Sequence, residues 1–257
     1  SYTRFRKQFE MPIMKNEDAA ARNRLRKMTA PFLLRRSKSQ VLSDLPEKDE
    51  KTIYSGMEDE QRKLYLAAHK QLVDQLQGID SAYYEKNKIF ILSQLTKLRQ
   101  ICCHPALCYD DYQGSSAKLE ACMELVQRAV KGKHKVLLFS QFTSMLDLIR
   151  ERLAEQNTKY YCLTGNTDKQ ERQRLVDEFQ NDDTPVFLIS LKAGGTGLNL
   201  TAADIVIHYD PWWNVAAQNQ ATDRAHRIGQ KNTVTVYRLI AKDSLEEGII
   251  KLQESKK

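Results

Sequence analysis

Two arginines and a glutamine recur at helical spacing near the end of the chain, in AAQNQATDRAHRIGQ (216–230). At about 100° per residue, a helix would place Gln220, Arg224 and Arg227 within about 60° of one another. The planar guanidinium pairs well with phosphate oxygens, so this stripe predicts a polyanion beside the helix. The alternative is solvent, because most charged helix faces are simply wet, and the spacing does not decide between the two.

A glycine-rich loop, LKAGGTGLNLTAAD (191–204), follows the apolar run VFLIS (186–190). Its glycines permit backbone conformations with exposed N–H groups that could bind phosphate. The Walker A pattern G-x-x-x-x-G-K-[ST] occurs nowhere in the chain. A dinucleotide fingerprint also fails, because Gly195 and Gly197 are followed by Leu200 where the third glycine belongs. Asp210 ends an apolar run as a ribose-binding acid would, but it lacks that fingerprint.

Positive charge is concentrated at the start of the chain. Residues 1–40 hold eleven Lys and Arg against three acids, an excess of eight, so the remaining residues of a chain of net charge +7 sum to about −1. This basic arm suits a phosphate backbone, and an ordinary exposed helix face is the alternative. The opening SYTRFRKQFE has neither an initiator Met nor an apolar signal core, which is typical of an excised fragment. No apolar run approaches the roughly 20 residues of a membrane span.

The five cysteines are an odd number in a chain without a signal sequence, which indicates reduced thiols inside a cell. In CCHPALC, three of them lie beside His104. No second Cys or His pair follows at zinc-finger distance, so we predict buried thiols at a helix end and no metal site.

The elements that must position these residues change in character along the chain. Residues 1–115 show helical periods and almost no strand pattern; the segment 58–76 has an apolar stripe and 87–103 repeats it, with a loop between them. From about residue 116, strands expected at 135–140, 160–163, 186–190, 205–209 and 233–240 alternate with helices. One helix, 167–180, is expected to open with a capping box from Thr167 to Gln170. The apolar stripe expected on the helix 58–76 consists of Leu64, Ala68, Leu72, Val73 and Leu76.

Alternating strands and helices predict an α/β fold with a parallel sheet covered on both faces. Ligands of such sheets bind beyond the carboxyl ends of the strands, where the loops QFT (141–143), TGNT (164–167) and the glycine loop are expected. A sheet lobe with a glycine loop, without a Walker lysine and with an arginine helix, is typical of one half of a two-lobed nucleotide-driven machine. The other half cradles the nucleotide, and the arginines stabilise charge during phosphoryl transfer.

AGGTGLNLTAADIVIHYDPWWN followed by QATDRAHRIGQ resembles motifs V and VI of the Swi/Snf family of DNA translocases, in helicase superfamily two. KVLLFSQFTSMLDLI resembles the family's motif IV, and TGNTDKQERQRLVDEF resembles the element that follows it. PFLLRRSKSQVLSDLPEK, LRQICCHPAL, SAKL and VYRLIAKDSLEEGI resemble further family segments. The resemblance runs from about Leu25 to the end of the chain, and the family's first lobe, with its Walker A lysine, has no counterpart.

This resemblance implies a RecA-like parallel sheet with helices on both faces, preceded by a mainly helical family-specific segment. Residues 1–50 would be a basic linker from the first lobe, 51–115 a helical insertion, and 116–257 the second RecA-like lobe. The resemblance implies that the chain is the second lobe of an ATP-dependent duplex-DNA translocase. This lobe alone would be inactive as an ATPase. ATP with Mg would be bound mainly by the first lobe, and DNA through its phosphate backbone. The implied protein is a monomer inside the cell, in the nucleoid or nucleus.

Two other functions remain open at this point: the lobe of a true strand-separating helicase, and a DNA-binding module without an ATPase role. The missing third glycine disfavours a nucleotide-dependent oxidoreductase.

The family's functional residues carry over to matching positions. Arg224 and Arg227 match the motif VI arginines that approach the ATP phosphates, and both are expected to be exposed; the alternative is an ion pair from Asp223 to Arg227 at i,i+4. Gln220, Gly195 and Gly197 are expected near the nucleotide. The expected DNA contacts are Gln141, Phe142, Thr143, Thr164, Gly165, Arg172, Lys192, Thr196, Asn199 and Trp213.

Each of these residues also has a structural alternative: a tight turn for the glycines, burial for Trp212 and Trp213, and solvation for Lys192. Arg35 and Arg36 match a family segment in which linker structure and DNA contact both remain open. Val215 stands where many members have proline, a substitution expected to adjust only the start of the arginine helix.

Overall fold

The computed structural model describes residues 2–32, 45–77, 81–193 and 197–255, without the side chains of 81–86. The chain forms two compact units, residues 1–44 and 45–257, and each is described by itself. None of the helices in the described ranges is long and apolar enough to cross a membrane.

The first unit is helical where it is described. It contains α1 (Tyr2–Phe5), the π-helical turn η1 (Arg6–Glu10), α2 (Met11–Asn16), α3 (Ala19–Thr29) and the 3₁₀ turn η2 (Ala30–Phe32). Helix α3 begins after Asp18, whose carboxylate accepts hydrogen bonds from Ala20 N and Ala21 N at 2.9 and 3.0 Å. The eight Lys and Arg side chains between residues 4 and 27 are all exposed, so this unit presents a basic surface. Arg35 and Arg36 lie outside the described residues.

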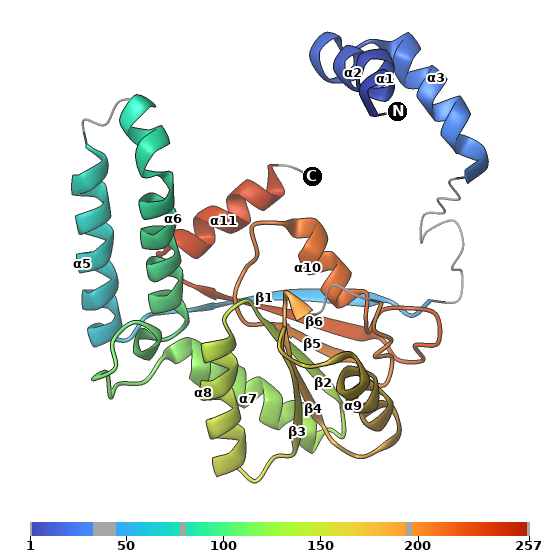
Figure 1. Cartoon of the computed structure of the whole chain (residues 1–257). Coiled ribbons are helices and arrows are strands. Elements are labelled where there is room, and N and C mark those ends of the chain that lie inside the picture. Colours follow the sequence, from blue (N-terminus) through green and yellow to red (C-terminus); the bar gives the residue numbers. More distant parts are fainter. Residues whose placement is uncertain (1, 33–44, 78–80, 194–196, 256–257) are drawn as a thin grey trace. The chain divides into compact units, whose positions relative to one another are not determined.

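The second unit is built on one sheet of six parallel strands in the order β1-β6-β5-β2-β4-β3 (Figure 1). The strands are β1 (Lys48–Ser55), β2 (Val136–Ser140), β3 (Tyr160–Leu163), β4 (Val186–Ser190), β5 (Ile205–His208) and β6 (Val234–Ala241). Strands β2 and β4 are buried along their whole length, because central strands of a covered parallel sheet face helices on both sides.

The helices of this unit are α5 (Asp59–Leu76), α6 (Ser81–Cys103), η3 (Pro105–Leu107), α7 (Ala117–Lys131), α8 (Thr143–Glu155), α9 (Lys169–Asn181), α10 (Val215–Thr222) and α11 (Leu245–Glu254). Apolar residues of α7 and α8 pack on one face of the sheet, and those of α9 and α10 on the other. Helices α5 and α6 form a hairpin whose lower part packs with Ala241 and Leu245 at the end of β6 and the start of α11 (Figure 1). The predicted α/β sheet with helices on both faces is confirmed.

The expectation that residues 1–115 contain almost no strand was wrong at β1. The strand KDEKTIYS carries four charged residues, and most of its side chains are exposed. Charged side chains are common on edge strands, which they protect from pairing with other chains. Because β1 is held by parallel pairing with β6, nearly two hundred residues later in the sequence, its local pattern gave no strand signal.

Three further differences concern element ends and faces. Helix α6 begins at Ser81, so the expected loop before residue 87 is shorter. Helix α9 is capped by Asp168, which accepts from Gln170 N and Glu171 N, and the predicted capping box from Thr167 was wrong. Thr167 Oγ1 instead accepts from Thr164 N at 3.1 Å and closes the preceding loop. On α5, Val73 and Leu76 of the expected stripe are exposed, whereas Leu72 is buried.

Candidate nucleic-acid and nucleotide interface

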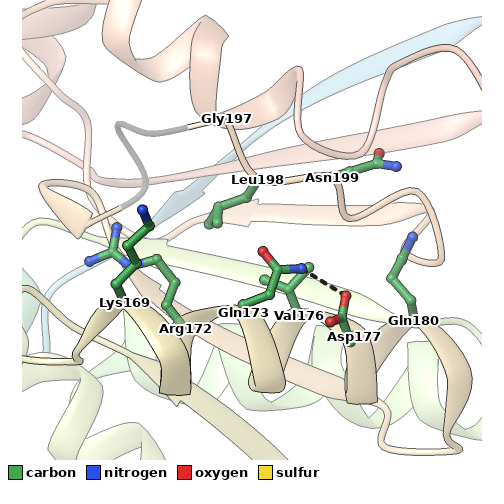
Figure 2. Close-up of a pocket in the computed structure, with 9 residues that line it drawn as sticks. All are labelled: Lys169, Arg172, Gln173, Val176, Asp177, Gln180, Gly197, Leu198 and Asn199. Carbon is green, nitrogen blue, oxygen red and sulfur yellow. Dashed lines mark hydrogen bonds between the residues drawn. The ribbon is translucent and has the colours of Figure 1, made fainter.

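Four loops meet along the carboxyl edge of the sheet, because β5, β2, β4 and β3 are neighbours and run in the same direction. They bring together most of the residues expected at DNA. Thr143, Gly165, Lys192 and Trp213 are exposed there, and Gln141, Phe142, Thr164 and Arg172 are half-buried. Asn199 is exposed farther along the glycine loop, where it lines a cavity together with Gln180 of α9 (Figure 2). Gly195 and Thr196 lie outside the described residues.

The turn after β2 is organised by a buried carboxylate. Asp210 Oδ1 accepts from Ser140 Oγ at 2.5 Å and from Gln141 N at 3.2 Å, and Ser140 Oγ accepts from Phe142 N at 3.1 Å. The backbone amides of Gln141 and Phe142 therefore already have partners within the chain. Helix α8 begins at Thr143 without a side-chain cap, and its first residues are exposed. The first amides of α8 are the part of this turn suited to a phosphate.

Asp210 is buried, whereas an acid that binds ribose must be open to its ligand. Only 1% of the residue is exposed, and burial raises the pKa of its carboxyl to about 6, against the opposing effects of Ser140 and Arg99. Arg99 Nη2, from α6, lies 3.8 Å from Asp210 Oδ2. Arg99 has no predicted role, because nothing in the sequence of its own helix indicates a partner more than a hundred residues away.

The glycine loop and α9 enclose a cavity of about 540 Å³ (Figure 2). Its lining combines a basic end, an apolar floor and an amide-rich rim: Lys169, Arg172, Gln173, Val176, Asp177, Gln180, Gly197, Leu198 and Asn199. Gly197 adopts φ +34°, a conformation that favours glycine. Arg172 Nη1 donates to Ala193 O at 3.0 Å, so this expected DNA contact also holds the start of the glycine loop in place.

Helix α10 is shorter than the sequence predicts. Asn214 caps it by accepting from Ala216 N and Ala217 N, with Val215 as the first helical residue, and the helix ends at Thr222. Arg224 and Arg227 lie in the turns that follow, so the predicted single helical stripe with Gln220 was wrong. Asp223 and Arg227 both follow the end of the helix, so helical i,i+4 spacing no longer predicts an ion pair between them.

Long-range hydrogen bonds account for this early end. Leu200 N donates to Arg224 O at 3.0 Å, and Gln230 Nε2 donates to Ala203 O at 2.8 Å. Thr222 Oγ1 lies 2.8 Å from Nε2 of the buried His208 on β5. These contacts hold the backbone of residues 222–230 against β5 and the end of the glycine loop. A continuous helix would have to give up the bonds that Leu200 N and Gln230 Nε2 make.

The two arginines differ in exposure. Arg227 is exposed, as predicted, but Arg224 is only 5% exposed, so the expectation that both would be open to solvent was wrong for Arg224. Burial lowers the pKa of the Arg224 guanidinium, and the positive charge of Arg227 lowers it further. Gln220 is exposed on α10. The segment thus carries one exposed guanidinium, that of Arg227, and one buried guanidinium, that of Arg224.

The cysteines of the described residues are free thiols. Cys102 and Cys103 are fully buried at the end of α6, and burial raises the pKa of both thiols. Within the described ranges, no three His, Cys, Asp or Glu side chains gather in a way that could hold a metal ion.

Two family models match the chain: an SNF2-related domain over residues 1–107 and a helicase conserved C-terminal domain over residues 117–229. An uncharacterized ATP-dependent helicase of Mycoplasma pneumoniae is 40% identical over 255 residues, which is 98% of this chain and 24% of that protein. The putative ATP-dependent helicase/translocase YwqA of Bacillus subtilis is 42% identical over 265 residues, 100% of this chain and 28% of that protein. The chain thus spans about a quarter of the length of these curated relatives.

Solved structures extend the similarity to three dimensions. The Sulfolobus solfataricus SWI2/SNF2 ATPase core in complex with dsDNA is 37% identical with a TM-score of 0.71, covering 99% of this chain and 54% of that one. The C-terminal domain of the Sulfolobus solfataricus SWI2/SNF2 ATPase is 35% identical with a TM-score of 0.69, covering 82% of this chain and 86% of that one.

Proposed function

Because the chain belongs to the SWI/SNF family of ATP-dependent helicases and has its RecA-like sheet, we propose that it is the second lobe of an ATP-driven translocase on duplex DNA. In this proposal residues 116–257 form the lobe, with β1 added to its sheet; residues 51–115 supply the helical insertion, and residues 1–50 lead in from the first lobe. The protein acts inside the cell as a monomer.

The observation that carries this proposal is the gathering of four polar loops at one edge of the sheet. Thr143 at the start of α8 and Lys192, Asn199 and Trp213 on loops are exposed on segments that follow three different strands. Hydroxyl, ammonium and amide groups of this kind bind phosphate and sugar without reading bases. A surface of this composition suits the backbone of a duplex, and sequence preference is expected to be weak.

The arginine segment has the second role in the proposal. Exposed Arg227 meets the ATP phosphates across the cleft between the lobes, and Arg224 lies near it within the fold, with Gln220 and Gly197 close to the nucleotide. Mg and most of the ATP contacts belong to the first lobe. Since this chain has no Walker A loop, we expect the 257 residues by themselves to hydrolyse ATP negligibly.

The test is Arg227→Ala in the intact two-lobed protein. Turnover at saturating ATP and DNA should fall by roughly 10³-fold or more, the range in which finger arginines act. DNA binding and the melting temperature should stay unchanged, because Arg227 is exposed. Arg227→Lys should rescue little, since an ammonium lacks the planar fork. Arg128→Ala, at an exposed arginine on α7, is the matched control and should have no effect. A lower melting temperature with normal turnover in the remaining folded protein would show a structural role instead.

A strand-separating helicase is the second candidate, because the Mycoplasma relative is named a helicase and the Bacillus relative a helicase/translocase. A translocase and a strand-separating helicase differ in whether single-stranded DNA is released. A translocase consumes ATP on blunt duplex and displaces a protein or third strand ahead of it, while the duplex stays paired. Release of a labelled strand from a tailed duplex, at a rate matching ATP turnover, would favour the helicase.

A further inference from the structure

We propose that Arg99 and Gln253 are positioning residues that fix the loop of Pro211, Trp212 and Trp213 for contact with DNA. This role depends on the proposed function, because it assigns a purpose to a loop that the proposal places at DNA. Neither residue lies in that loop. Arg99 belongs to α6 and Gln253 to α11.

Side chains from three helices bind the backbone of this loop. Arg99 Nη2 donates to Pro211 O at 2.6 Å. Gln253 Nε2 donates to Trp212 O, and Trp212 N donates to Oε1 of Gln218 on α10 at 3.2 Å. All three side chains belong to buried residues, with exposed fractions of 3 to 6%. Three consecutive polar groups of an irregular loop are thus tied to three separate helices.

Arg99 also contacts the aromatic rings of two neighbouring loops. Its guanidinium lies 5.4 Å from the centre of the Trp213 ring and 5.7 Å from that of Phe142. Both distances suit a cation–π interaction. Trp213 keeps 44% of its surface exposed. One buried cation therefore supports an exposed indole and joins the loop after β5 to the loop after β2.

Stability alone is a weak reason for this arrangement, because taking a guanidinium out of water is costly and an apolar side chain would fill the space more cheaply. Orientation is a better reason. A partly exposed tryptophan on an irregular loop would lose conformational freedom on binding DNA, and a loop that is already fixed loses less. The expected consequence of losing these bonds is weaker coupling to DNA in an otherwise folded protein.

The first measurement is the duplex-DNA concentration that half-saturates ATP turnover of the intact two-lobed protein. Arg99→Ala should raise it about five- to tenfold, in keeping with the loss of a fixed aromatic contact. In a Trp213→Ala background, Arg99→Ala should add less than about a twofold change, because residues that act through one another are not additive. Independent, fully additive effects would overturn the proposal.

Gln253→Met gives a second, milder variant in case Arg99→Ala folds poorly. Methionine has about the same volume as glutamine but lacks the Nε2 group that donates to Trp212 O. Gln61→Met is its matched control: Gln61 is also buried and donates from Nε2 to a backbone carbonyl, Ile101 O at 2.8 Å, away from the loop. Gln253→Met should raise the half-saturating DNA concentration, and Gln61→Met should leave it unchanged.

Amide hydrogen exchange separates this inference from the proposed function. Exchange at residues 212–214 should accelerate in Arg99→Ala and Gln253→Met but not in Gln61→Met, with no DNA present. Unchanged exchange in both variants overturns the positioning role. Faster exchange with an unchanged DNA dependence also overturns it. If the unaltered protein shows no DNA-stimulated turnover, the proposed function fails, and the exchange result still decides whether the two residues hold the loop.

Discussion

Asp210 is the residue that joins two of the loops at the carboxyl edge of the sheet. Its carboxylate accepts from Ser140 Oγ and Gln141 N and lies near Arg99, so it joins the turn after β2 to the loop after β5. Burial raises the pKa of this carboxyl from its ordinary value of 3.8 to about 6. Ser140, Arg99 and Lys118 act in the opposite direction without cancelling the effect of burial, and Glu246 adds to it.

The raised pKa predicts a definite dependence of stability on pH. Between about pH 4 and pH 6 the folded protein keeps a proton on Asp210 that the unfolded chain has released, so the contribution of this group to stability falls as the pH rises. With a pKa of 3.8 in the unfolded chain and about 6 in the folded protein, the stability lost across this pH window is about 3 kcal/mol. Equilibrium unfolding by urea at a series of pH values should show the wild type losing stability relative to Asp210→Asn across this window, with no further change above it.

The opposite sign would contradict this prediction. If the wild type gains stability relative to Asp210→Asn as the pH rises from 4 to 6, the attraction of Arg99 and the hydrogen bonds outweigh burial, and the pKa in the folded protein is lowered.

Between elements, one buried ion pair joins the start of α7 to the start of α11. Lys118 Nζ lies 2.7 and 2.6 Å from the two carboxylate oxygens of Glu246, and the two side chains are 2% and 0% exposed. Glu246 Oε2 also accepts from Ala241 N at 2.8 Å, at the end of β6. Burial would lower the pKa of Lys118, but Glu246 raises it above its usual range, so Lys118 stays charged.

Removing one partner should cost far more than removing both charges. Lys118→Met leaves a buried carboxylate without its cation, and the free energy of unfolding should fall by about 3–5 kcal/mol. Adding Glu246→Gln should recover part of that loss, since the amide oxygen still accepts from Ala241 N. Chemical denaturation of the three proteins measures both steps. Arg128→Ala, which breaks an exposed pair with Glu124 on α7, is the control and should change little. A double variant less stable than Lys118→Met would contradict this account.

Across the whole molecule, the distribution of charge predicts how DNA is bound. Lys and Arg exceed acids by eight in residues 1–40, and the described cations of this segment are exposed. Lys192 adds an exposed ammonium at the carboxyl edge of the sheet. Binding carried by such groups releases counterions and is therefore weakened by salt.

DNA affinity should be weak, nearly independent of sequence, and steeply dependent on salt. Lys192→Ala should reduce the slope of log affinity against log salt by about 0.9, the contribution of one phosphate contact. Lys131→Ala is the control, because this exposed lysine precedes β2 and lies at the other edge of the sheet. Fluorescence anisotropy with two duplexes of unrelated sequence provides the measurement. A shallow slope, or a strong preference for one sequence, would count against a translocase.

The sequence by itself determined the family, the parallel sheet and the edge at which the polar loops gather. The family follows from the resemblance of the motif segments, such as QATDRAHRIGQ. The sheet and its edge follow from local signals: strand-length apolar runs such as VLLF and VFLI alternate with amphipathic helices, and parallel strands place all their following loops on one side. Motif residues in those loops were predicted to contact DNA and nucleotide, and their roles stay predictions.

Tertiary structure decided the features that depend on partners distant in sequence. Strand β1 exists because β6 pairs with it, α10 ends at Thr222 because Arg224 O and the Gln230 side chain bond to Leu200 N and Ala203 O, and Arg224 is buried while Arg227 is not. The bond from Arg99 to Pro211 spans 112 residues. A residue's own neighbours in the sequence set its helix or strand preference, but its burial and hydrogen-bond partners are set only when the chain has folded.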